Sequence, residues 1–151
     1  MNRMNRWKGH KAMAGTQFLN PPEMGPSQGL YSQIVHHQES SLAFVSGQVA
    51  IDNRGTFVGE GDVAKQTEQI FKNIGAALAS LDEDWASVLK LTTYLTSPDD
   101  FPAFAATRKQ LFESYYPDGR YPGHTLLVVS ALSAPLHLVE LEAVVAHSTS
   151  P

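Results

Sequence analysis

The fold is set by residues 62–95, which read DVAKQTEQIFKNIGAALASLDEDWASVLKLTTYL. Apolar residues recur at steps of three and four through the first half, which predicts an amphipathic helix over 63–81. Asp62 stands at the N-cap position of that helix. The second half, residues 88–95, is rich in leucine and threonine and is typical of a strand. Alternation predicts that one face of this strand carries Leu89, Leu91, Thr93 and Leu95.

The flanking segments extend this helix and strand into the order ββαβαββ. β-forming residues upstream predict a hairpin, whose second strand is expected to bulge or kink at Gly47. Downstream, Pro98 and the two acids after it predict the start of a second helix. Two apolar runs then predict two closing strands. These elements are expected over residues 33–37, 42–51, 98–115, 125–129 and 138–146.

This order predicts an α+β fold, a mixed sheet with two helices on one face. The last two strands are apolar at nearly every position, so the second face of the sheet should be buried as well. No third helix is predicted inside the chain to cover it. Burial against copies of the same chain is the economical solution, and equivalent faces that meet around an axis predict a closed homo-oligomer.

The 151 residues are enough for one domain, and no apolar run is long enough to span a bilayer. The first twenty residues hold four basic residues and no acid, and they lack the apolar region of a secretory signal. We interpret residues 1–28 as an extended or disordered segment, 29–147 as the single domain and 148–151 as a tail. The absence of cysteine is compatible with a reducing compartment, and we expect a cytoplasmic protein.

Charge and motif spacing disfavour several classes of function. Beyond the basic head, seven basic and fifteen acidic residues leave a net charge of −8, and the basic residues are scattered, so nucleic acid is a poor partner. The six histidines show no metal-ligand spacing, and we expect no metal site. The sequence also lacks a GxSxG nucleophile elbow and a complete phosphate-binding loop.

Two positions are candidates for chemistry. Alternation in the last predicted strand places Glu140 and Glu142 on one face of an otherwise apolar strand, which is costly unless a cleft solvates or a partner pairs with at least one of them. The alternative is a solvent-exposed or salt-bridged edge. His124 follows Tyr121-Pro122-Gly123 where a loop enters a strand, a common place for a functional side chain, although an ordinary hydrogen-bonded histidine explains it as well.

Three short motifs resemble the Rid family, the YjgF-like reactive intermediate or imine deaminases formerly labelled endoribonuclease L-PSP. They are GLYSQ at 29–33, FVSGQ at 44–48 and LVELEA at 138–143, which are similar to the family's GPYSQ, SGQ and VEIEA segments. The resemblance covers residues 29–146. It implies a chorismate-mutase-like fold that assembles as a homotrimer, with ligand clefts at the subunit contacts.

The resemblance also implies an activity, the hydrolysis of an enamine or imine derived from an amino acid to a 2-keto acid and ammonia, without a cofactor. Tyr31, Ser46 and Glu140 occupy family site positions. Glu140 is expected to position or activate water, and Tyr31 and Ser46 are expected to form hydrogen bonds in the site.

Two family residues are replaced in this chain. His124, after Gly123, stands where the family has a substrate-binding arginine, and Ala105 stands where it has an asparagine. Histidine lacks the permanent bidentate fork of arginine. We therefore expect a site that suits a neutral, larger or differently charged small molecule, contacted by His124, with Gly123 and Ala105 making room for it.

Two other functions stay open on the sequence. One is a Rid-like module without catalysis that binds a small metabolite at the trimer cleft. Saturable binding without ammonia release would distinguish it from an enzyme. The other is ribonuclease activity, which the net charge of −8 and the scattered basic residues disfavour.

Overall fold

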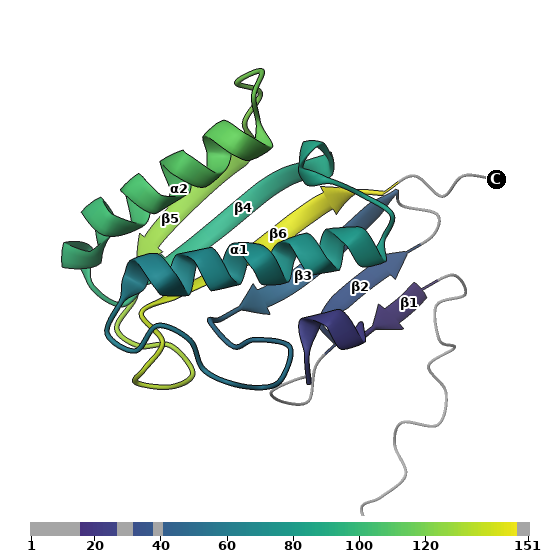
Figure 1. The fold of residues 1–151 in the computed structure, drawn as a ribbon. Coiled ribbons are helices and arrows are strands. Elements are labelled where there is room, and N and C mark those ends of the chain that lie inside the picture. Colours follow the sequence, from purple (N-terminus) through teal and green to yellow (C-terminus); the bar gives the residue numbers. More distant parts are fainter. Residues whose placement is uncertain (1–15, 27–31, 38–40, 148–151) are drawn as a thin grey trace, which may run out of the picture.

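A computed structural model describes residues 16–26, 32–37 and 41–147. In this part of the chain six strands form one sheet, and two helices cover one of its faces (Figure 1). The strand order is β1-β2-β3-β6-β4-β5, with β4 and β5 parallel and the other neighbours antiparallel. From β2 onward this confirms the predicted ββαβαββ order and the α+β class. The strands are β1 (Thr16–Leu19), β2 (Ile34–His37), β3 (Leu42–Gln48), β4 (Val88–Leu95), β5 (Gly123–Val128) and β6 (Val139–Ala146).

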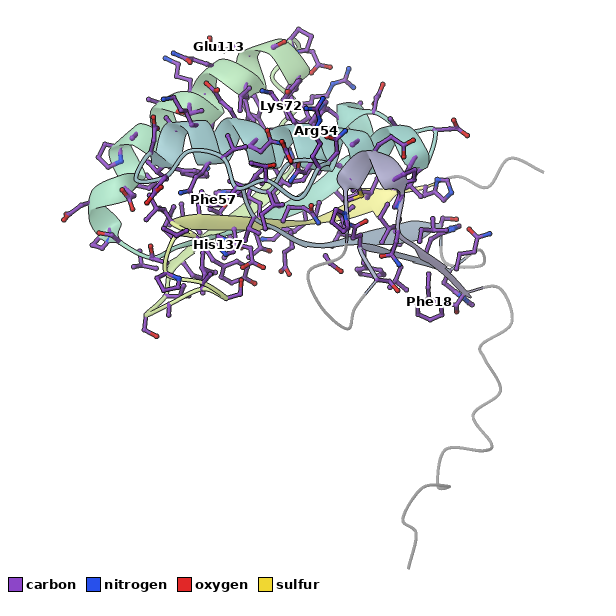
Figure 2. The ribbon with its side chains drawn as sticks, turned by 60° about the horizontal axis from the view of Figure 1, so that its bottom comes forward. Phe18, Arg54, Phe57, Lys72, Glu113 and His137 are labelled. Atoms are coloured by element: carbon purple, nitrogen blue, oxygen red, sulfur yellow. The ribbon has the colours of Figure 1, made fainter. Side chains whose placement is uncertain are left out.

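The structure adds an edge strand, β1, that the sequence pattern does not predict. Its four residues pair antiparallel with β2, and Phe18 lies on the side of the sheet away from the helices (Figure 2). A 3-10 turn at Pro22–Met24 follows and buries Met24 in the core. Residues 16–24 thus belong to the sheet and the core, although they precede the predicted start of the domain. Four residues show too little periodicity for a strand to be recognised from sequence.

The helices are α1 (Val63–Ser80) and α2 (Phe101–Tyr115), on the same face of the sheet (Figure 1). The predicted N-cap of α1 is confirmed, because the Asp62 side chain accepts a hydrogen bond from the backbone N–H of Lys65. The α2 helix begins three residues later than predicted, since Pro98–Asp100 form a 3-10 turn first. The buried side of α1 and the sheet together make the core.

One predicted strand face is wrong in detail. Leu89 was expected beside Leu91, but it is 49% exposed, whereas Val88 is buried. The reason is a register shift between Val88 and Lys90 against β6, which gives β4 one extra residue and turns Leu89 outward. The bulge predicted at Gly47 is confirmed by a similar shift between Val45 and Gln48 in β3.

The sheet face away from the helices, here called the open face, is not covered within the chain. It carries exposed apolar side chains such as Phe44, 50% exposed, and Leu127, 42% exposed. This is the face that the sequence predicts to be buried against other copies. Among the residues described, no helix is long and apolar enough to cross a membrane.

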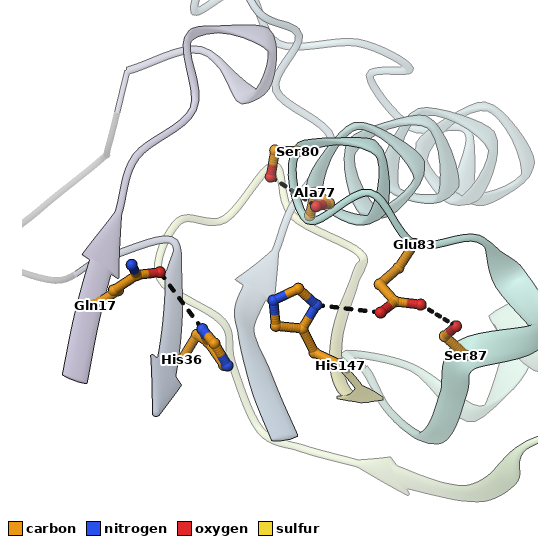
Figure 3. A network of polar contacts seen from close by, with 7 residues as sticks. All are labelled: Gln17, His36, Ala77, Ser80, Glu83, Ser87 and His147. Atoms are coloured by element: carbon orange, nitrogen blue, oxygen red, sulfur yellow. Dashed lines mark hydrogen bonds and ion pairs between the residues drawn. The ribbon is translucent and has the colours of Figure 1, made fainter. Parts of the chain in front are cut away.

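A polar cluster lies where β2 and the end of β6 approach the turn after α1 (Figure 3). The buried ring of His36 meets the ring of His147 edge-on, with 4.3 Å between centroids. His147 Nδ1 donates to Glu83 Oε1 at 3.1 Å, and the Ser87 hydroxyl donates to the other oxygen of Glu83. Burial first, and then His147 and His37, lowers the pKa of His36, so its ring is neutral in the core.

Candidate functional site

A cleft of about 450 Å³ opens between the bulge in β3 and the loop that enters β6. We call it the Glu140 cleft. Its size suits a small metabolite, and none of the described residues that line it is a lysine or arginine. The lining residues are Ser46, Gly47, Val49, Ile51, Ser133, Ala134, His137 and Glu140.

Glu140 owes its position to Gly47. A Cβ atom on Gly47 would lie 1.9 Å from Glu140 Oε1, so any side chain there would collide with the carboxylate. Glu140 points to the open face, whereas its neighbours Val139 and Leu141 are buried beneath the helices. On the open face its carboxyl group is half-buried, because it lines the cleft. Burial, with a smaller contribution from Glu142, raises the pKa of Glu140. A raised pKa makes this carboxylate a stronger base than an ordinary glutamate, which suits it to accept a proton from water and return it.

Ser46 belongs to the same cleft because of the bulge. Its backbone N–H donates to the Gln33 carbonyl at 2.9 Å, and its hydroxyl donates to the Ser32 carbonyl at 2.8 Å. The hydroxyl proton is thus used by the backbone, while the oxygen lone pairs are free to accept a hydrogen bond from a ligand. Among the residues described, no basic side chain forms a hydrogen bond with the Ser46 hydroxyl, which argues against a role as nucleophile.

His137 is a cleft residue that sequence reasoning counted among the histidines but did not select. It is 8% exposed, its Nδ1 lies 3.2 Å from Ser133 Oγ, and its ring packs against Phe57 (Figure 2). Burial lowers the pKa of His137. One feature of the sequence could have identified His137 as a cleft residue, namely its position three residues before Glu140, in the loop that enters the same strand.

Two amide side chains of α1 hold the walls of the cleft. Asn73 Nδ2 donates to the carbonyls of Val49 and Ile51, at 3.1 and 2.8 Å. On the other wall, Gln66 Nε2 donates to the Leu136 carbonyl at 3.0 Å, and Gln66 Oε1 accepts from the Leu138 backbone N–H at 2.9 Å. The segment that carries His137 is therefore fixed on both sides. Buried side-chain hydrogen bonds of this kind give a preformed cleft.

A second cavity, of about 340 Å³, lies on the helix side of the sheet at the β5 edge. We call it the Arg108 cavity. His124 is in it because β5 pairs with β4 in a register that sets His124 beside Leu91, whose side chain is buried under the helices. The lining residues are Arg108, Lys109, Phe112, Glu113, Tyr121, Pro122 and His124.

Both ring nitrogens of His124 are used inside the protein. Arg108 Nη1 donates to His124 Nδ1 at 2.9 Å, and because a guanidinium can only donate, Nδ1 carries no proton. The remaining N–H, on Nε2, donates to Thr93 Oγ1 at 2.9 Å. Burial first, and then the charges of Arg108 and Lys90, lowers the pKa of His124 to about 4. The ring is neutral at physiological pH, and its hydrogen bonds hold Arg108.

The predicted site residues therefore fall into two places. Ser46 and Glu140 meet in the Glu140 cleft, whereas His124 lies on the opposite side of the sheet in the same chain. Gly123 is exposed at the start of β5, and Ala105 is half-buried on α2 without lining either cavity. Tyr31 lies outside the described residues. Glu142, the second acid of the strand, accepts a hydrogen bond from the Tyr94 hydroxyl at 3.1 Å.

No group of three or more potential metal ligands occurs among the residues described. The Glu140 cleft instead joins one carboxyl group of raised pKa with a neutral histidine and a hydroxyl acceptor. Such a set can hold a water molecule and transfer its proton.

Comparison with known proteins identifies the family. The family model described as Endoribonuclease L-PSP matches residues 23–147. A 2-iminobutanoate/2-iminopropanoate deaminase of Mus musculus is 31% identical over 82% of this chain and 83% of its own length. A RutC family protein of Synechocystis is 30% identical over 82% of this chain and 88% of its own length.

Solved structures agree with this match. The crystal structure of a putative endoribonuclease from Thermotoga maritima superposes with a TM-score of 0.74 and 28% identity, and it covers 87% of this chain and 98% of that one. The fold is thus the chorismate-mutase-like fold of the YjgF proteins. The chain belongs to the Endoribonuclease L-PSP family, the Rid or YjgF-like family that its three short motifs resemble.

Proposed function

We propose that this chain forms a cytoplasmic homotrimer that hydrolyses the C=N bond of a small imine, or of the enamine from which it forms, and releases ammonia. The observation that carries the proposal is the half-buried carboxyl group of Glu140, whose pKa is raised and which lies against Gly47 in a cleft of about 450 Å³. The mouse relative is named as a deaminase of 2-iminobutanoate and 2-iminopropanoate, which supports the reaction class.

The reaction needs one water molecule and a group that can move protons. Glu140 accepts a proton from water while the oxygen attacks the carbon of the N-protonated imine, and the C=N electron pair moves to the nitrogen to give a neutral tetrahedral amino alcohol. Glu140 then gives its proton to the nitrogen, and the C–N bond breaks as the hydroxyl proton returns to the Glu140 carboxylate and the carbonyl forms. Glu140 passes this last proton to the departing ammonia, so the sum is protonated imine plus water giving ketone and ammonium, and no cofactor is required.

The open face supports the trimer. Phe44 and Leu127 are about half exposed there, and Phe18 is 64% exposed at the β1 end of the sheet. Burying the exposed half of side chains of this size gives a hydrophobic contribution on the order of 1 kcal/mol for each, about half the value for a fully exposed side chain.

Ribonuclease activity has less support in this chain. A nuclease needs basic groups to bind phosphates, and the described lining of the Glu140 cleft contains none. A module that binds the same small molecule without turnover stays the alternative, and the following experiment separates it from an enzyme.

The test is ammonia release from an imine made in the assay by oxidising an L-amino acid with an amino acid oxidase. We expect the protein to accelerate the reaction above spontaneous hydrolysis, and Glu140→Gln to lower its turnover by about 10²–10⁴ while ligand binding persists, because the amide keeps the shape but loses the basicity. Glu142→Gln is the matched control, because it removes the same charge two residues away on the same strand face. It also removes the smaller contribution of Glu142 to the raised pKa of Glu140, so turnover should fall far less than in Glu140→Gln. Saturable binding without acceleration by the wild-type protein favours the binding module. Equal turnover in Glu140→Gln and wild type excludes Glu140 as the catalytic group.

A further inference from the structure

The guanidinium of Arg108 is a half-buried cation for which the described part of the chain supplies no anion. No carboxylate of the described residues forms an ion pair with it. Its Cζ lies 5.4 Å from the centre of the Phe104 ring and 5.7 Å from that of Phe112, and its hydrogen-bond partner is the neutral ring of His124. The aromatic faces and the histidine hold the group in place without neutralising its charge.

This arrangement is costly without a ligand. Burial lowers the pKa of Arg108, which means that the protein surroundings disfavour its charge. An arginine still stays protonated at any physiological pH, so the charge cannot be removed by losing a proton. One of its five N–H groups donates to His124 Nδ1, and the others can serve an anion.

The space next to Arg108 suits a small anion. The cavity of about 340 Å³ has apolar walls from Phe112, Tyr121 and Pro122, and Arg108 contributes the polar end. Lys109 and Glu113 also line it, but they are largely exposed and form an ion pair with each other at 3.9 Å. Apolar walls with a few polar groups, of which Arg108 and His124 are held in place by their hydrogen bond, are the usual composition of a small-molecule site.

We propose that Arg108 is the anion-binding residue of this protein, and that its guanidinium binds the carboxylate of a small 2-keto or 2-imino acid. His124 then acts as a positioning residue, because its Nδ1 accepts from Arg108 and its Nε2–H is anchored on Thr93. The inference rests in part on the proposed function, since an imino acid carries the carboxylate that Arg108 would bind. It also departs from the expectation from sequence, which was a neutral, larger or differently charged ligand contacted by His124, because Arg108 on α2 supplies a cation.

The geometry also predicts how the two sites cooperate. Glu140 pairs with Tyr94, and His124 pairs with Leu91 three residues earlier in β4, so Glu140 and His124 are two strands apart. Strand spacing and rise put their Cα atoms on the order of 14 Å apart, with side chains on opposite sides of the sheet. A small substrate that touches both Glu140 and Arg108 therefore lies between two copies of the chain.

Binding of pyruvate to the full chain, measured by isothermal titration calorimetry, tests the assignment without any need for turnover. We expect pyruvate to bind the wild type, and Arg108→Gln to raise its Kd by about tenfold to a hundredfold, as for a lost hydrogen bond to a charged group. Arg54→Gln is the matched control, because it removes the same charge by the same substitution on an exposed side chain that lines neither cavity, and it should change Kd less than about threefold. Methyl pyruvate, which lacks the charge, should bind equally weakly to wild type and Arg108→Gln.

Three further variants test the geometry of the site. Arg108→Lys keeps the charge but not the planar fork and should bind pyruvate with intermediate affinity. His124→Gln keeps an acceptor for Arg108 and should retain most of the affinity, whereas His124→Leu should lose it. If both His124 variants bind equally, the positioning role is excluded.

The assignment of Arg108 is overturned if wild type does not bind pyruvate at millimolar concentration, or if Arg108→Gln binds it as well as wild type does while showing the same melting curve. It is also overturned if Arg54→Gln loses as much affinity. Inorganic phosphate that binds as tightly as pyruvate would indicate an unselective anion site instead of a carboxylate site. Pyruvate binding that depends on Arg108 without any ammonia release would leave the subsite standing and remove the proposed reaction.

Discussion

The Glu140 cleft and the Arg108 cavity use opposite electrostatic designs. In the cleft a carboxyl group lies in surroundings that raise its pKa, and no basic side chain of the described lining neutralises it. In the cavity a cation is held by aromatic faces and a neutral histidine, and no described acid pairs with it. Proton transfer by Glu140 and recognition of an anion by Arg108 are therefore separated in this chain. An ion pair between these two side chains would lower the pKa of Glu140 and neutralise Arg108, and both functions would be lost.

Apart from Glu140→Gln, the largest expected loss of turnover comes from a change in the wall of the Glu140 cleft. Gly47→Ala places a Cβ where Glu140 Oε1 now lies, so the carboxylate has to move by an ångström or more. We expect imine turnover to fall by about a hundredfold, the usual consequence of such a displacement. Pyruvate binding at Arg108 should change little in comparison.

Gly75→Ala is the control for that variant. A Cβ on Gly75 meets only the Trp85 ring at 3.9 Å, which is ordinary contact, and the position lies inside α1. Alanine there should raise the free energy of unfolding by about 0.5–1 kcal/mol and leave turnover intact. If Gly47→Ala retains full turnover, the contact between Gly47 and Glu140 has no catalytic importance.

The Glu140 cleft could be predicted from the sequence to a greater extent than the Arg108 cavity. The α1 helix, the β4 strand and the Gly47 bulge rest on local patterns, and all three could be recognised in advance. The meeting of Ser46 with Glu140 follows from the SGQ and VELEA motifs on neighbouring strands. These elements are predictable because each depends on alternation or on a motif within a few residues.

The Arg108 cavity could not be predicted in this way. Arg108 and His124 are sixteen residues apart, and their contact depends on how α2 packs over the β5 edge, which no periodicity encodes. The sequence shows that His124 replaces the family arginine, but it does not show that His124 holds Arg108 by a hydrogen bond. The sequence predicts that His124 contacts the ligand, whereas both of its ring nitrogens form hydrogen bonds within the protein, to Thr93 and Arg108. The outward turn of Leu89 was missed for a similar reason, because a bulge depends on the partner strand.

A smaller effect is expected on the pH dependence of stability, to which one histidine of each region contributes. Burial lowers the pKa of His124 to about 4, and it also lowers that of His137. The unfolded chain takes up a proton below about pH 6.5, while the folded chain keeps both rings neutral. Stability is therefore full above pH 6.5 and is lost as pH falls, for His124 until about pH 4. After allowance for partial exposure, we expect His124 to account for a loss of about 2 kcal/mol across this range.

The measurement is the free energy of unfolding in urea at pH 7.5 and at pH 5, for wild type, His124→Gln and His137→Gln. Each variant should lose part of the pH dependence. His36, whose pKa is also lowered by burial, should contribute the same background to all three proteins. A wild-type stability that does not change between the two pH values would contradict the neutral, buried histidines in both regions.

The smallest expected effect tests whether the two regions are mechanically independent. Asn73→Ala removes the two hydrogen bonds that hold the carbonyls of Val49 and Ile51, and it leaves these groups to find water at the cleft wall. We expect a loss of about 1–2 kcal/mol in unfolding free energy and a turnover reduced only severalfold, because the Gln66 side of the cleft stays intact. Gln69→Ala is the control, since it removes the neighbour that donates to Asn73 Oδ1 but spares both wall contacts. Pyruvate affinity should stay the same in both variants, because the Arg108 cavity is built from α2 and β5 without either residue. A parallel loss of turnover and pyruvate affinity in Asn73→Ala would mean that the wall of the Glu140 cleft also shapes the Arg108 cavity, which would contradict the separation of the two regions within one chain.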